Sequence, residues 1–127
     1  KFSKHYYPVV GDLQADGEEF ECAQAIDRNP LVKHWVRNLD RQPDYSFWLP
    51  TATDLFYPDF VAELKDGRIL VVEYKGGHLL GGPDAQEKLN VGQLWEAKSS
   101  GEGLFLMARK KDDNGRDVYR QIEDKVS

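Results

Sequence analysis

The apolar residues of this chain are densest in two neighbouring runs, residues 57–64 and 68–75. Both runs are rich in Val, Ile, Leu, Phe and Tyr, which is typical of strands. The three residues between them, Lys65-Asp66-Gly67, include an Asp-Gly pair, which favours a tight hairpin turn. The pattern therefore predicts a β-hairpin with a three-residue loop, in which Leu64 pairs with Arg68.

This pairing places four polar side chains on one face of the hairpin. Counting back from the turn sets Asp59 opposite Glu73 and Tyr57 opposite Lys75, and the alternation of strands turns all four to the same side. Opposed carboxylates in a sheet repel each other by roughly 0.2–1 kcal/mol, and their mutual field raises the pKa of at least one. A bound cation removes this penalty, and the lysine reduces it.

Two interpretations of this face remain open at this point. The charged residues can be ordinary surface residues on a solvated sheet, but the neighbouring positions on both faces are too apolar for that. Otherwise the residues form a site. A change of one residue in the loop would separate Asp59 from Glu73, so the site depends on the register.

A carboxylate pair beside a lysine suits the hydrolysis of phosphodiesters. Mg²⁺ takes oxygen ligands, is usually held by one or two carboxylates, and keeps several waters and substrate oxygens. We expect Asp59 and Glu73 to bind Mg²⁺, with Mn²⁺ as a substitute, and the peptide carbonyl of Tyr74 to supply a further ligand. Lys75 would orient or deprotonate the attacking water, or stabilise charge that develops on phosphorus.

Pro58-Asp59 followed by Glu73-Tyr74-Lys75 resembles the signature of the PD-(D/E)xK nucleases. Longer strings between about residues 5 and 109 are similar to the C-terminal nuclease region of type III restriction subunits and their helicase-linked relatives: GEEFECAQAID, VKHWVRNL, FWLP, FYPDFVAELKDGRILVVEYKG and EKLNVGQLW. The resemblance implies an α/β fold, a restriction-endonuclease-like sandwich with a central mixed β-sheet flanked by helices. It also implies DNA as the substrate and a helicase or translocase module in the same parent chain.

Residues 18–27 are predicted to form a helix on which Cys22, Ala23 and Ile26 share an apolar face, with Glu19 in the middle of it. An acid that faces a core needs a partner, although a glutamate in a first turn can simply complement the helix dipole. In the resembling family, a glutamate in the pattern E-x-x-F-A-x-x-L-D completes the active site. Glu19 matches that position, with Cys22 where Phe is usual, so the resemblance makes Glu19 a further catalytic acid.

The remaining segments are predicted to form the scaffold. Asp84-x-x-Glu87 resembles a capping box that opens a helix to about residue 98. Lys88 lies among the apolar positions of this helix, and either its stem follows the apolar surface or, as the resemblance implies, it turns to the catalytic face and contacts a DNA phosphate. The other expected elements are a strand or short helix at 31–38, for which the family's order favours the strand, a strand at 47–49, a loop at 50–56, a strand at 103–109 and a helix at 117–126.

Length and composition are compatible with this assignment. A chain of 127 residues, 40% hydrophobic, is predicted to be one globular domain over residues 1–127. It has no apolar run long enough for a membrane span and no signal peptide, and its start at Lys1 suggests a fragment excised from a longer protein. A single cysteine, Cys22, cannot form an internal disulfide, which favours the cytoplasm.

The net charge of −5 argues against a nucleic-acid binder that acts alone. Either another module of the parent protein delivers the DNA, or a local basic patch binds it. Residues 109–111 are the densest basic run, and Lys33, Arg37 and Arg41 form a looser one. Two aspartates follow the first run directly, so a solvated turn is an equal interpretation there.

We therefore predict a Mg²⁺-dependent DNA endonuclease domain, in which a dimer would allow both strands to be cut. The main alternative is a catalytically silent DNA-binding or docking module on the same scaffold. A third is a phosphohydrolase acting on RNA or nucleotides. His78 follows Lys75 closely enough to approach the site, although a histidine in a glycine-rich loop is more often a surface residue.

Overall fold

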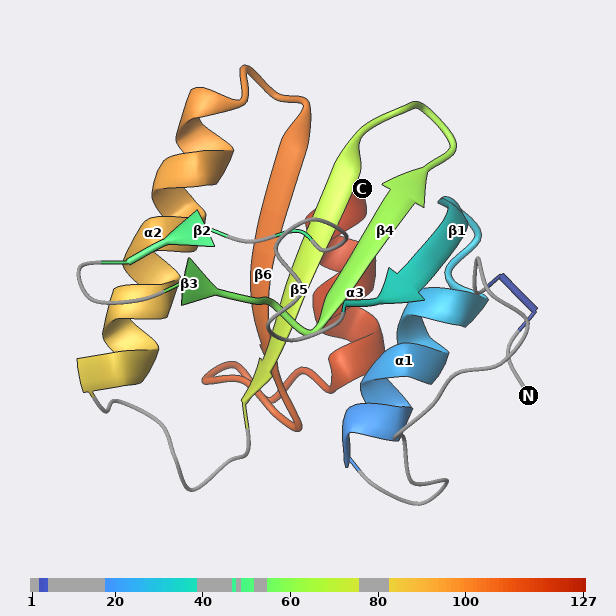
Figure 1. Ribbon diagram of the computed structural model, residues 1–127. Coiled ribbons are helices and arrows are strands. Elements are labelled where there is room, and N and C mark those ends of the chain that lie inside the picture. The colour runs from blue at the N-terminus through green and yellow to red at the C-terminus, as the bar shows by residue number, and fades with distance from the viewer. Residues whose placement is uncertain (1–2, 5–17, 39–46, 48, 52–54, 76–82) are drawn as a thin grey trace.

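The computed structural model describes residues 3–4, 18–38, 47, 49–51, 55–75 and 83–127. Figure 1 shows their elements, which follow in the order α1 (Glu18–Arg28), β1 (Val32–Arg37), β2 (Leu49–Pro50), β3 (Leu55–Phe56), β4 (Phe60–Leu64), β5 (Ile69–Lys75), α2 (Pro83–Lys98), β6 (Gly103–Arg109) and α3 (Val118–Val126). The strand at 31–38, the helix to residue 98, the strand at 103–109 and the final helix are thus confirmed as elements.

Four of the strands form the central sheet, in the order β1-β4-β5-β6. β4 is antiparallel to both of its neighbours, whereas β5 and β6 are parallel, so the sheet is mixed. Helices α1 and α3 pack against one face, and α2 covers the other together with the short β2–β3 ribbon (Figure 1). The predicted α/β sandwich with a central mixed sheet flanked by helices is confirmed. None of the helices described here is long and apolar enough to cross a membrane.

The sheet separates two apolar cores, and β5 contributes to both. Leu70 and Val72 point into the larger core under α1 and α3, whereas Val71 points into the smaller core under α2. All three side chains are fully buried, and each such burial stabilises the fold by roughly 1.5–3 kcal/mol. Because side chains alternate along a strand, Glu73 follows Val71 onto the α2 side.

The predicted hairpin register is confirmed. Val61 pairs with Val71 and Phe60 with Val72, as the three-residue loop requires. The N–H of Leu64 donates to the carbonyl of Arg68 at 2.8 Å, and Gly67 adopts a φ of +95°, which favours glycine. The loop therefore fixes which residues of the two strands face each other.

The first strand of the hairpin is shorter than predicted, because it begins at Phe60 and not at Tyr57. Continued in the same register, the ladder would next pair Pro58 with Tyr74 as a hydrogen-bonded couple. Proline has no N–H to give, and the N–H of Tyr74 donates instead to the Asp59 carboxylate at 2.8 Å. The ladder ends there, and the predicted pairing of Tyr57 with Lys75 is wrong.

Two further predictions need correction. The segment 50–56 is not wholly a loop, because Leu55–Phe56 pairs with Leu49–Pro50 in a small ribbon. The capping box at Asp84 is also wrong, because α2 already begins at Pro83, a residue favoured at the first helical position. The predicted features at Arg41, Trp48 and His78, with the glycine-rich loop around that histidine, lie outside the described residues.

Candidate functional site

Asp59 lies just before β4, where its backbone and side chain are both fixed. Its carbonyl accepts the N–H of Asn38 at 2.8 Å, which extends the pairing of β1 with β4 by one residue. Its carboxylate accepts the N–H of Tyr74 at 2.8 Å. Burial raises the pKa of Asp59, and the hydrogen bond from Tyr74 opposes that rise in part. The carboxylate is thus aimed at the end of β5.

Glu73 is the most deeply buried acid at this place, with a side chain 8% exposed. Its Oε2 lies 3.8 Å from the Nζ of Lys75 and 3.8 Å from the Nζ of Lys88. Its Oε1 is buried and has no hydrogen-bond partner among the described residues. Burial first, and then the charge of Asp59, raise the pKa of Glu73 to about 8, against the pull of the two lysines.

Glu19 stands on the first turn of α1, and its Oε1 accepts a hydrogen bond from Nη2 of Arg37 at 3.3 Å. Burial and the nearby charge of Asp59 raise the pKa of Glu19, and Arg37 lowers it. Asp59 therefore interacts with Glu19 on one side and with Glu73 on the other. The three acids predicted from the sequence form one connected cluster.

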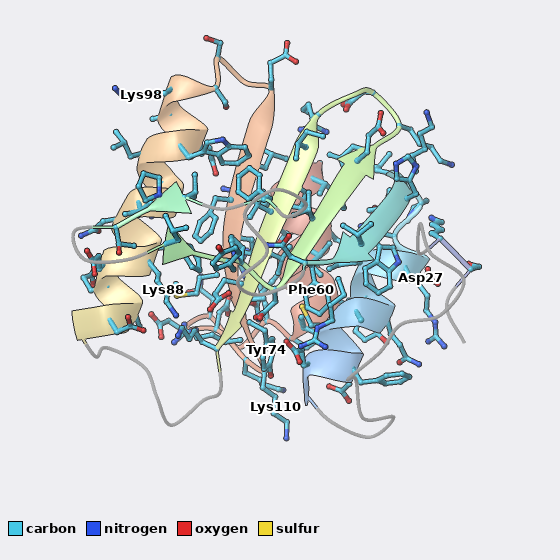
Figure 2. All side chains as sticks on the ribbon, in the orientation of Figure 1. Asp27, Phe60, Tyr74, Lys88, Lys98 and Lys110 are labelled. Atoms are coloured by element: carbon cyan, nitrogen blue, oxygen red, sulfur yellow. The ribbon has the colours of Figure 1, made fainter. Side chains whose placement is uncertain are left out.

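Lys88 turns toward Glu73, on the side that the resemblance implied for it. Its Nζ lies 3.8 Å from Glu73, 3.3 Å from the Asp84 carboxylate and 5.4 Å from the centre of the Phe56 ring. Figure 2 shows Lys88 on α2, beside the lower part of the sheet. Its contact with a DNA phosphate stays a prediction.

The backbone of Tyr74 also faces this cluster. Along β5, residues 70, 72 and 74 direct their backbone groups toward β4, because Phe60 pairs with Val72 while the N–H of Ile69 donates to the carbonyl of Glu102 on the β6 side. The Tyr74 carbonyl therefore lies on the Asp59 side of β5, where Pro58 cannot donate to it. A role as a metal ligand remains a prediction.

A divalent cation is compatible with the donor set. Among the parts of the chain described here, no group of three or more His, Cys, Asp or Glu side chains is arranged to hold a metal ion. Two carboxylates and a carbonyl suffice for Mg²⁺, which keeps several waters. The unpartnered Oε1 of Glu73 leaves one buried carboxylate oxygen that a hard cation could take.

The sequence did not identify Arg37 as part of the site. It appeared only as one member of a loose basic group, yet it holds Glu19 and also favours the charged form of Asp59. Nothing in the spacing joins the end of β1 to the start of α1. Asp84, the partner of Lys88, did carry a signal, since an acid four residues before a lysine on a helix favours an ion pair.

The predicted basic run at residues 109–111 lies among acidic residues with which neighbouring cations pair. Arg109 pairs with Asp113 at 3.0 Å, and Arg116 pairs with both Asp112 and Asp124. Lys110 is exposed. For this run, the solvated turn is the interpretation that the ion pairs favour.

No family model, no curated protein and no solved structure matches this chain. The resemblance to the PD-(D/E)xK nucleases therefore stays a prediction from motifs and their order. The function has to be argued from the geometry of the site.

Proposed function

We propose that this chain is a metal-dependent DNA endonuclease domain that hydrolyses phosphodiester bonds, with Mg²⁺ as its ion and Mn²⁺ as a substitute. The observation that carries the proposal is the Glu73 carboxylate. It is buried, one of its oxygens lacks a partner among the described residues, and it lies beside a second acid and two lysines. Strongly perturbed acids of this kind gather at functional sites more often than elsewhere.

Asp59 and Glu73 would hold the ion, together with the Tyr74 carbonyl. When bound, the ion polarises the phosphate, lowers the pKa of water and steadies the leaving oxygen. The hydrogen bond from the Tyr74 N–H keeps the Asp59 carboxylate in place before any ion arrives. Such preorganisation avoids rearrangement during the reaction.

Lys75 would act on the water and on the phosphate. Its side chain is 15% exposed, and its ammonium lies 3.8 Å from Glu73. From there it can donate a hydrogen bond that orients the attacking water, and its charge stabilises the negative charge that grows on the phosphate oxygens.

Lys88 and Glu19 would flank this centre. Lys88 would contact a neighbouring phosphate of the substrate. Its ion pair with the exposed Asp84 would break when this contact forms. Glu19, fixed by Arg37, would act as the third acid and set the charge around Asp59.

We further propose that the domain belongs to a restriction-type or helicase-linked protein of the cytoplasm. The buried free thiol of Cys22 fits a reducing compartment. A helicase or translocase module of the parent chain would supply the DNA contacts that a net charge of −5 does not favour. Two copies would be needed to cut both strands at one place.

The test is the nicking of supercoiled plasmid in Mg²⁺ and in Mn²⁺, with EDTA as the metal-free control. Lys75→Ala should reduce the rate at least about 100-fold. Lys65→Ala is the matched control, because it removes an exposed lysine from the turn of the same hairpin. It should leave the rate unchanged.

The outcomes separate the candidates. Nicking that survives in Lys75→Ala would mean a contaminant or a different site. If neither metal supports nicking, Mn²⁺ titration of the wild type and of Asp59→Ala decides between a catalytic site and a docking module. Mn²⁺ binding by the wild type that is lost in Asp59→Ala would support the catalytic site. Binding of DNA without any Mn²⁺ affinity would identify a docking module.

A further inference from the structure

A groove runs along the outer side of β6, the edge strand of the sheet, and opens beside Lys75. Its volume is about 420 Å³, within the range of small-molecule sites. One wall is α2, and Lys125 from α3 reaches it from the other side of the strand. Lys75 thus belongs both to the acid cluster and to the groove, so a molecule in the groove adjoins the proposed scissile phosphate.

The charge of the groove differs from that of the whole chain. Three cations line it, Lys75, Arg109 and Lys125, against one carboxylate, that of Asp113, in a protein of net charge −5. Arg109 holds Asp113 at 3.0 Å, but that carboxylate is 95% exposed. Exposed pairs contribute little stability, so a phosphate can take the place of Asp113. Lys125 is paired with Glu96 at 3.0 Å.

The remaining lining suits a nucleobase. Met107 and Leu89 supply apolar surface, and Gln86 and Gln93 supply two amides that lie two turns apart on α2. The Gln86 amide donates to the exposed Asn90 at 2.9 Å, a contact that a base edge can replace. Methionine packs favourably against aromatic rings, and glutamine amides hydrogen-bond the edges of bases. Met107 is the only methionine in the chain.

A peptide strand is a poor occupant of this groove. Both ends of the outward backbone of β6 are already bonded by side chains. Ser99 accepts the N–H of Gly103, Glu96 accepts that of Phe105, and Gln121 bonds both the N–H and the C=O of Arg109. Added strands bind through a long row of open backbone groups, and these side chains interrupt that row at both ends. Contacts to the groove must come from side chains.

We infer that the groove binds one unpaired nucleotide next to the scissile phosphate, with its base against Met107 and its phosphate between Lys75 and Arg109. The inference rests on the proposed nuclease function and names the substrate class, which is single-stranded or locally unpaired DNA. A base within a duplex is stacked and paired, and it enters such a groove only after it is extruded.

The single methionine gives a direct measurement. With [¹³C-methyl]methionine, the protein shows one methyl resonance from the groove, and EDTA prevents cleavage during the titration. Hexathymidylate should shift this resonance upfield through the ring current of a stacked base, in a saturable way. An abasic hexamer with the same phosphates and a short blunt duplex should not.

A variant that fills the groove tests the same inference by affinity. Gln86→Trp places a bulky ring at an exposed position of the α2 wall, and Leu94→Trp is the matched control at an exposed position of the same helix outside the groove. By fluorescence anisotropy, Gln86→Trp should weaken the binding of labelled hexathymidylate at least roughly tenfold. It should leave the binding of the duplex unchanged, and Leu94→Trp should change neither.

The two proposals can fail separately. If the abasic or duplex probe shifts the methyl resonance as much as hexathymidylate does, or if Gln86→Trp binds all probes like the wild type, the groove is not a nucleotide site. Plasmid nicking would still support the nuclease in that case. A base-dependent shift in a protein that neither cleaves DNA nor binds Mn²⁺ would retain the groove and overturn the nuclease.

Discussion

Exchanging Glu73 for glutamine tests whether this buried carboxyl works against folding in the metal-free protein. Burial and the charge of Asp59 raise the pKa of Glu73 to about 8, from an ordinary value of 4.5. The folded protein therefore holds this proton more tightly than the unfolded chain does. The stability that the protonated group contributes is complete below pH 4.5 and is lost as the pH rises through about 8.

The size of the effect follows from these two values. At 1.36 kcal/mol for each pKa unit, the rise from 4.5 to about 8 corresponds to roughly 5 kcal/mol of folding free energy. The free energy of unfolding of the wild type, minus that of Glu73→Gln, should fall by up to about 1.4 kcal/mol per pH unit between pH 5 and 8. Because Glu73 interacts with Asp59, and Asp59 with Glu19, the three carboxyls titrate together. The pH-dependent change in stability is therefore a property of the whole cluster and not of Glu73 alone.

The assay is urea unfolding in EDTA at a series of pH values from 5 to 9. Glu123→Gln, an exposed exchange on α3, is the matched control and should follow the wild type at every pH. Saturating Mn²⁺ should remove or reverse the loss above pH 7, because the ion binds the charged form. Parallel stability curves for the wild type and Glu73→Gln would refute the reasoning, since the buried carboxyl would then cost nothing.

Three further predictions concern Lys88 and two positions of the scaffold. Lys88→Met should slow plasmid nicking about 10–100-fold without lowering the melting temperature, and an unchanged single-turnover rate would exclude Lys88 from substrate contact. Asp27→Asn should lower the free energy of unfolding by about 1–3 kcal/mol. Both carboxylate oxygens accept hydrogen bonds, Oδ1 from the Trp35 indole at 3.0 Å and Oδ2 from the Ser3 N–H at 3.1 Å, and asparagine keeps only one acceptor oxygen; urea unfolding checks this, and no loss would contradict it. Gly92→Ala should cost a similar amount, since the added Cβ would lie 2.4 Å from the Phe105 ring, and an unchanged thermal midpoint would show that α2 can move away.

The sequence was sufficient to predict the parts of the fold whose geometry depends on residues close together in the chain. The three-residue loop determined the register of β4 against β5, and with it the approach of Asp59 to Glu73. The position of Glu19 followed from helical spacing, with Cys22 and Ile26 buried on the same face as expected. Local periodicity and turn length were enough because each of these relations lies within one element or one hairpin.

What the sequence did not show depends on contacts between distant elements. The ion pair of Arg37 with Glu19 joins the end of β1 to the start of α1, and no periodicity links those places. The groove beside Lys75 requires α2, β6 and α3 to be set against each other first. The early end of the ladder could have been foreseen, because Pro58 lacks the N–H that its place opposite Tyr74 would need.

Pro58 and Asp59 are therefore best understood as one device. Counted from the turn, the last pair of the ladder is Phe60 with Val72, because Pro58 cannot complete the next hydrogen-bonded pair. The Tyr74 N–H therefore donates to the Asp59 carboxylate. Burial raises the pKa of Glu19, Asp59 and Glu73 alike, and the neighbouring donors and cations offset only part of that rise. A sheet end built for stability alone would place apolar residues here, since a buried carboxylate without a full set of partners is destabilising. A bound cation would relieve the remaining unfavourable energy, and this supports the proposed metal-dependent reaction over a structural role.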